Sequence, residues 1–85
     1  MQISEKSIQD TIDSIVGICR RGTSECHSEF MVDDYYWHTR SQLQGLRFLF
    51  VDCSKVLSLI DAARLETDVI RAEGKARLVD GQLAS

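Results

Sequence analysis

The chain has 85 residues, which is the length of a single domain with a modest core, and we treat residues 1–85 as one helical domain. Hydrophobic residues make up 44% and charged residues 27%, a composition that excludes a disordered chain. The net charge of −3 lacks the basic excess of a general nucleic-acid binder, so we expect no nucleic-acid partner.

The first predicted element is a helix over residues 4–21. Ser4 is a suitable N-cap, and Glu5 is an acid in the first turn, where the helix dipole favours it. Its buried face is predicted from apolar residues at helical spacing, which are Ile8, Ile12, Ile15, Val16 and Cys19. Gly22 suits the left-handed position that follows a last turn, so we expect the helix to end there.

A second helical stretch is predicted over about residues 24–44, after a polar connection. Its apolar residues spread around the helix, so its buried face is less clear. One interpretation buries Phe30 and Trp37 against the first helix. Another starts a new helix at Asp33 or Asp34.

A third helix is predicted over about residues 46–73, with a frayed tail over 75–85 beyond Gly74. Its apolar residues alternate spacings of four and three, as in a coiled-coil seam formed by Leu46, Phe50, Cys53, Leu57 and Ile60. Residues 46–51 are apolar nearly all round, so a buried strand there is an alternative, and residues 24–73 form either one helix or two.

These patterns predict an all-α fold of two to three amphipathic helices, forming a small bundle or helical hairpin that oligomerisation completes. Proline is absent from the chain, which favours long helices. The first residues do not resemble a signal peptide, and no apolar stretch reaches the roughly 20 residues of a membrane span. Together with an odd number of cysteines, three, this predicts a cytoplasmic protein without membrane contact.

Two sets of residues are candidates for chemistry. The candidate metal ligands are Cys19, Cys26, His27 and His38, but adjacent Cys26 and His27 point about 100° apart on a helix and make a poor ligand pair. A cysteine nucleophile at Cys26 would need a base and a group that orients it. The sequence supplies no such set, so we expect no metal, no cofactor and no enzymatic activity.

Two features instead indicate an interaction surface. Acids recur at Glu25, Glu29 and Asp33, with Asp34 beside them, and on one helix they would form a continuous acidic face. Such a face favours a protein partner with a basic surface, although acids near a helix N-terminus are also common without function. Three aromatic residues follow, Tyr35, Tyr36 and Trp37. They span about 200° of a helix, so at least one is expected to be exposed or in an interface.

We therefore expect a non-enzymatic protein that binds another macromolecule and inhibits or regulates it. Small regulators of this kind are common on phages and other mobile elements, so a phage accessory protein is one expected identity. The first alternative is an oligomeric nucleotide-binding protein that uses Arg20, Arg21, Arg40 or Arg47. The second is a helix-turn-helix DNA-binding regulator with its turn at Gly22, which the acids that follow disfavour.

We also expect a homodimer. The third helix carries a broader apolar band than the first helix can cover, and a helix that is apolar all round is buried on more than one face. The expected interface residues are Leu46, Phe48, Leu49, Phe50, Leu57 and Leu59. The alternative is that the second helical stretch covers this band within one chain.

Overall fold

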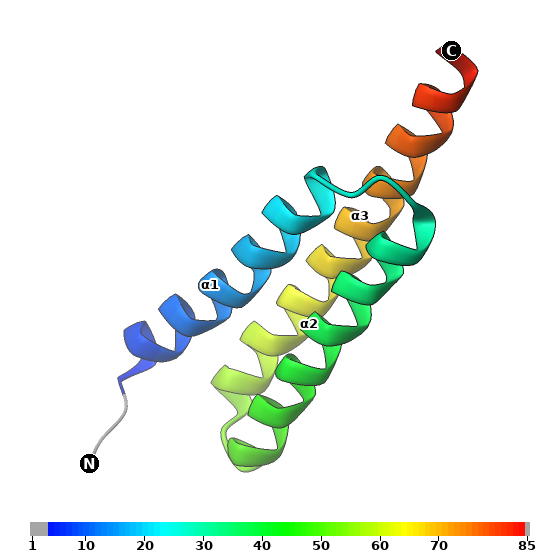
Figure 1. Ribbon diagram of the computed structural model, residues 1–85. Helices are drawn as coiled ribbons and strands as arrows, with labels where there is room; N and C mark the ends of the chain where they lie inside the picture. The colour runs from blue at the N-terminus through cyan, green and yellow to red at the C-terminus, as the bar shows by residue number, and fades with distance from the viewer. Residues whose placement is uncertain (1–3, 85) are drawn as a thin grey trace.

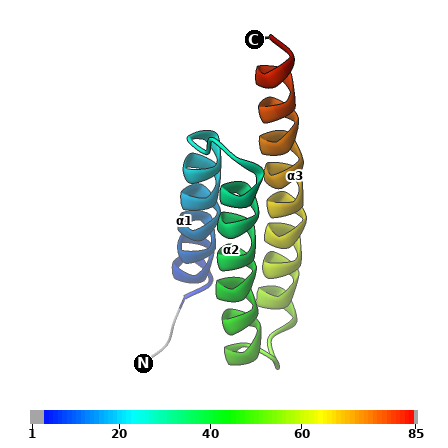
Figure 2. The same cartoon turned by 45° about the vertical axis from the view of Figure 1, so that its right-hand side comes forward.

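The computed structural model describes residues 4–84, with the side chains of residues 4–81, and it contains three helices in that range. They are α1 (Glu5–Ser24), α2 (Glu29–Leu49) and α3 (Ser54–Ala84). Each helix lies antiparallel to the next, and α3 extends past the connection between α1 and α2 (Figures 1 and 2). The prediction of an all-α bundle of packed helices is therefore confirmed.

The beginnings of α1 and α2 are set by serine residues that cap their N-termini. The hydroxyl of Ser4 accepts a hydrogen bond from the Ser7 amide, and Ser28 does the same for Met31. The predicted end of the first helix at Gly22 was wrong, because α1 continues to Ser24 and no described glycine has a positive φ. Gly22 lies inside α1, where the Tyr35 ring occupies the space that a Cβ would need.

Two other predicted boundaries were also wrong. The chain turns between α2 and α3 at residues 50–53, not at Gly45, so 24–73 is two helices. Residues 46–49 are helical, which rules out the strand alternative there. Gly74 does not end α3, and residues 75–84 are helical where a frayed tail was expected; Ser85 lies outside the described residues.

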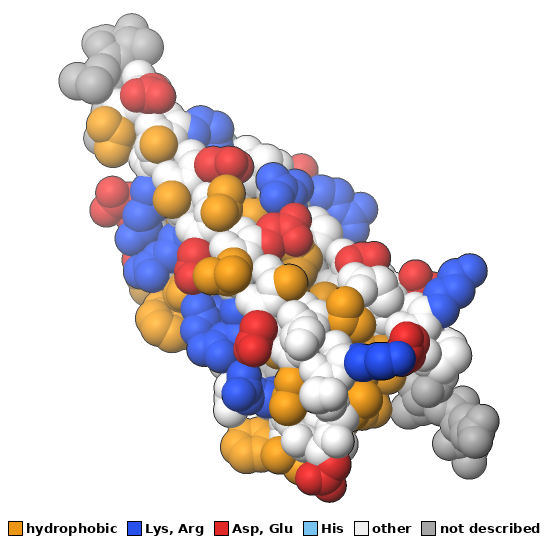
Figure 3. All heavy atoms as spheres, turned by 180° about the vertical axis from the view of Figure 1, so that it is seen from behind, with side chains coloured by type: hydrophobic (Ala, Val, Ile, Leu, Met, Phe, Trp, Pro, Cys, Tyr) orange, Lys and Arg blue, Asp and Glu red, His pale blue; other side chains and the backbone are white. Residues whose placement is uncertain are grey.

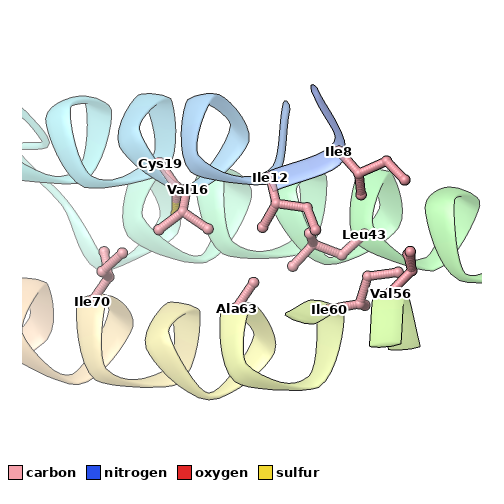
Figure 4. Packing of buried hydrophobic residues seen from close by; sticks show 9 residues of the cluster. All are labelled: Ile8, Ile12, Val16, Cys19, Leu43, Val56, Ile60, Ala63 and Ile70. Atoms are coloured by element: carbon pink, nitrogen blue, oxygen red, sulfur yellow. The ribbon is translucent and has the colours of Figure 1, made fainter. Parts of the chain in front are cut away.

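The core lies between the three helices, and each helix contributes one face to it. The buried hydrophobic cluster consists of Ile8, Ile12, Val16, Cys19, Leu43, Val56, Ile60, Ala63 and Ile70. Figure 4 shows these side chains pointing inward from the helices toward one another. Spacings of four and three recur on α3 from Val56 through Ile60 to Ala63, which is the seven-residue pattern of helices packed side by side.

At the end of the bundle where α1 connects to α2, the helices approach closely. A Cβ on Gly74 would lie 2.6 Å from the methyl carbon of Thr23 and 3.4 Å from Val32. The guanidinium of Arg77 donates hydrogen bonds to the carbonyls of Thr23 (2.9 Å) and Cys26 (3.2 Å). Glycine at position 74 is therefore a packing requirement and not a helix stop.

Candidate protein-interaction site

The predicted acidic face is divided by the fold. Glu25 is the C-cap of α1 and Glu29 begins α2, so the two acids do not share a helix. Asp33 forms ion pairs with Arg71 (2.8 Å) and Lys75 (3.0 Å) of α3. The hydrogen bond from Lys75, with that from Arg71, holds the pKa of Asp33 below its ordinary value. The predicted continuous acidic face was therefore wrong, and the ion pairs of Asp33 join α2 to α3.

The three consecutive aromatic residues have three different surroundings. Tyr36 is buried, and its hydroxyl donates a hydrogen bond of 2.6 Å to the Asp68 carboxylate, which raises the pKa of Tyr36. The Arg71 guanidinium lies over its ring, 4.5 Å from the centroid. Tyr35 lies over Gly22, partly exposed, and Trp37 is 58% exposed. Tyr36 is therefore structural, whereas Trp37 remains accessible.

Exposed residues gather where α1 connects to α2. We call this surface the connection-end patch, and it comprises Glu25, Glu29, Phe30, Met31, Asp34 and Tyr35. Phe30 is 79% exposed, which corrects the interpretation that buried it against the first helix. Among the described residues no ion pair involves Glu25 or Glu29, and Asp34 pairs only with exposed His38 at 3.6 Å. The patch thus joins an exposed aromatic ring to acidic groups.

A second surface lies along α2 and α3 on the outside of the bundle. We call it the α2–α3 face, and its exposed residues include Trp37, Ser41, Gln44, Phe48, Leu65 and Val69. A shallow groove of about 480 Å³ there is lined by residues of α2 from Trp37 to Phe48 and by Arg64 of α3. Figure 3, the view from behind Figure 1, shows hydrophobic side chains at intervals among acidic and basic ones.

Most of the predicted dimer interface belongs to the interior of one chain. Leu46, Phe50 and Leu59 pack against the core, and Leu57 is half-buried. Only Phe48 and Leu49 of the predicted set are strongly exposed, at 73% and 76%. These four residues are therefore wholly or partly buried within one chain, two of them on α2 or at its end and two on α3. Val69 was missed by sequence reasoning, and Leu65 was counted in the apolar band but not in the interface, although their spacing of four could have identified the pair.

The remaining candidates for chemistry lie apart from one another. Cys26 is buried, its thiol donates a hydrogen bond to the Gly22 carbonyl (3.2 Å), and burial raises its pKa, which disfavours the reactive thiolate. His27 is exposed beside it. Within residues 4–81, no three His, Cys, Asp or Glu side chains come together as a metal site. The geometry thus offers no assembled centre among the side chains it describes.

The arginines proposed for nucleotide binding mostly have carboxylate partners. Arg20 pairs with Glu66 (3.1 Å), Arg40 with Asp68 (3.1 Å) and Arg47 with Asp61 (2.9 Å); Arg21 is exposed. These pairs connect helices across the bundle. A phosphate at any of the three paired arginines would compete with a carboxylate that is already in place.

Comparison with protein-family models, with curated proteins and with solved structures finds no match to this chain. In the part of the chain that the structure describes, none of the helices combines the length and the apolar character that crossing a membrane requires.

Proposed function

We propose that the protein is a non-enzymatic interaction module, and that it binds and regulates another protein through the connection-end patch. The patch has the two chemical features of a binding surface. An aromatic side chain supplies apolar area to bury, and acidic groups beside it select a partner of opposite charge. The partner we infer is a protein with a basic surface.

The observation that supports this proposal best is the position of Phe30. Phe30 is 79% exposed although it lies only two residues from Val32, which is fully buried. Burying such a ring in an interface contributes about 1.5–3 kcal/mol. A partner that covers Phe30 must also approach Glu29 and Asp34, which are exposed on the same two turns of α2.

The acids determine which partner is favoured. The helix dipole stabilises Glu29 in the first turn of α2. This stabilisation needs no ion pair, so the charge of Glu29 faces solvent. A basic partner would gain from this charge at long range, so its association should weaken as the ionic strength rises. The two buried neighbours of the patch, Val32 and Tyr36, hold the first turns of α2 in place.

The test places a photo-crosslinking amino acid at Phe30 and, as a control, at Ile18, which is 56% exposed on α1. In cells of the native host, position 30 is expected to capture a distinct basic protein that position 18 does not. The double variant Glu29→Lys, Asp34→Lys should then reduce the affinity of that protein at least tenfold. Asp10→Lys, Asp13→Lys changes the net charge equally at exposed α1 positions and should have little effect.

Three outcomes would contradict the proposal. The first is the same captured proteins at both positions, and the second is no captured protein at position 30. The third is an equal loss of affinity in the two double variants, which would mean that only net charge matters. Helix content measured by circular dichroism shows whether each variant is folded.

A further inference from the structure

We propose that the α2–α3 face binds a second copy of this chain, with α2 of each copy lying over α3 of the other. The two-fold axis then runs along the helices, between the two copies. This inference concerns a surface separate from the connection-end patch and does not depend on the identity of any other partner. It rests on the sizes and the charges of side chains that lie at the same height along the bundle axis in α2 and in α3. We call such a height a level.

The levels are defined by ion pairs between the two antiparallel helices. Moving seven residues back along α2 moves seven residues forward along α3, through the pairs Arg47–Asp61, Arg40–Asp68 and Asp33–Lys75. Each residue of α2 therefore has a residue of α3 at its own level. Rotation about an axis parallel to the helices keeps these levels, so a residue of α2 meets the same level of α3 in the second copy.

The large residues of α2 lie level with stretches of α3 that include small exposed residues. Trp37 is three residues from Arg40, so it is level with Arg71, whose guanidinium lies 5.8 Å from the Trp37 ring centroid in the same chain, and it is next to the level of Ala72. Phe48 is one residue past Arg47, so it is level with the stretch between Ser58 and Ala62. Ala72, Ser58 and Ala62 are all exposed. Two aromatic side chains from each copy would thus be received by small residues of the other, in the manner of knobs in holes.

Between Trp37 and Phe48 the size relation is reversed, with small residues on α2 and a large one on α3. There α2 presents Ser41, Gln44 and Gly45, and a Cβ on Gly45 would meet no atom within 4 Å. At the same level α3 presents Leu65, which is 68% exposed. The small residues of α2 would therefore accommodate the large residue of α3. With the axis along the helices, the outlines match when α2 lies over α3, whereas α2 over α2 would bring each aromatic residue level with its own copy.

The charged residues of α2 and α3 also favour the arrangement with α2 over α3 of the second copy. Placing α2 over α3 of the second copy puts Arg47 near its Asp61, Arg40 near its Asp68 and Asp33 near its Lys75. Each ion pair of one copy then faces the reversed pair of the other, so opposite charges meet on both sides of the axis. An arrangement with α2 over α2 does not provide this match, because Arg40 and Arg47 would approach a helix that carries the same charges.

The first experiment measures mass by sedimentation equilibrium. We expect twice the chain mass of 9.6 kDa at tens of micromolar for the unaltered protein. Leu65→Glu should reduce the mass to one chain, while Ile18→Glu, the matched change on exposed α1, should leave the dimer intact. Both sites are exposed in the single chain, so both variants should keep their helix content. A single-chain mass for the unaltered protein, or the same result for both variants, would overturn the proposal.

The second experiment tests the arrangement of the copies. In a Cys53→Ser background, one chain carries Trp37→Cys and another carries Ala72→Cys. A disulfide requires Cα atoms within about 7 Å, so mild oxidation should link the two chains only in the mixture. Cys19 and Cys26 are buried and should not compete. A link in the Trp37→Cys chain alone, or no link in a mixture that still sediments as a dimer, would contradict the placement of α2 over α3.

Discussion

The two ends of the bundle are packed by different means. Near the turn between α2 and α3, the interior is made of branched aliphatic side chains such as Ile12, Leu43 and Ile60. Near the connection between α1 and α2, the interior includes Thr23 and Gly74, which bring two helix backbones together. The first end gains stability from buried apolar area, whereas the second depends on the absence of side-chain atoms.

This difference means that the same kind of substitution should have different effects at the two ends. Removing atoms creates a cavity in the aliphatic end, because neighbouring side chains relax only partly. Adding a single carbon is harmful at the close-packed end, because a tightly packed interior has no space for it. Substitutions at Ile12 and Gly74 test this contrast, and a third change tests the ion pairs of Asp33 that join α2 to α3 near the connection.

The largest effect is expected at the aliphatic end. Ile12 is 2% exposed, so Ile12→Ala should lower the free energy of unfolding by about 2–5 kcal/mol, through lost burial and the cavity left behind. Urea titration followed by circular dichroism measures this. Ile18→Ala, at an exposed position of the same helix, is the control and should change stability by less than about 0.5 kcal/mol. Similar values for the two variants would show that the face of α1 is wrongly assigned.

A smaller loss is expected from adding a methyl group at the other end. Gly74→Ala places a carbon 2.6 Å from the Thr23 methyl, and overpacking should outweigh the gain in helix propensity, for a net loss of about 1–2 kcal/mol. Gly17→Ala, where no atom lies within 4 Å, should instead stabilise by about 0.5–1 kcal/mol. The two variants should thus differ in sign. If Gly74→Ala also stabilised the protein, the close approach of α1 and α3 would be refuted.

The smallest effect depends on pH and concerns the ion pairs that join α2 to α3. Because the pKa of Asp33 is lowered in the folded chain, its contribution is present above the unfolded pKa and is lost as the pH falls through the folded pKa. Asp33→Asn should therefore be less stable than the unaltered protein at neutral pH, and this difference should shrink below about pH 4. Denaturant titrations over a pH series measure it, with Asp10→Asn as the control for losing one surface carboxylate. A difference that stays constant with pH would argue against the Asp33 ion pairs.

The sequence predicted the class of the fold and the buried face of α1, but not the turn between α2 and α3. The predicted seam crossed that turn, since Leu46 lies before it, Phe50 within it and Ile60 after it. Both helices bury residues in one core, so the apolar spacing continued across the break and concealed it. Gly45 was preferred as the break because glycine commonly ends helices, yet at this position the helix simply tolerates it.

The sequence did not reveal the structural roles of the residues in the predicted candidate site. The argument that three consecutive aromatic residues cannot all face one core was correct. Which of them is buried depends on Asp68 and Arg71 of α3, which surround Tyr36. Similarly, Asp33 was assigned to a binding surface because its partners, Arg71 and Lys75, lie 38 and 42 residues away in the sequence. Local spacing contains no information about such distant partners.

The hydrogen bonds from Arg77 have a consequence for the cooperativity of the fold. The Thr23 carbonyl accepts a local hydrogen bond from the Cys26 amide (3.2 Å) and a further one from the side chain of Arg77, 54 residues along the chain. The same side chain donates to the Cys26 carbonyl, just past the end of α1, so this segment gains its bonds from Arg77 only when α3 is docked. Local opening of one segment exposes the other, so their backbone amides should exchange with solvent deuterium as a single unit.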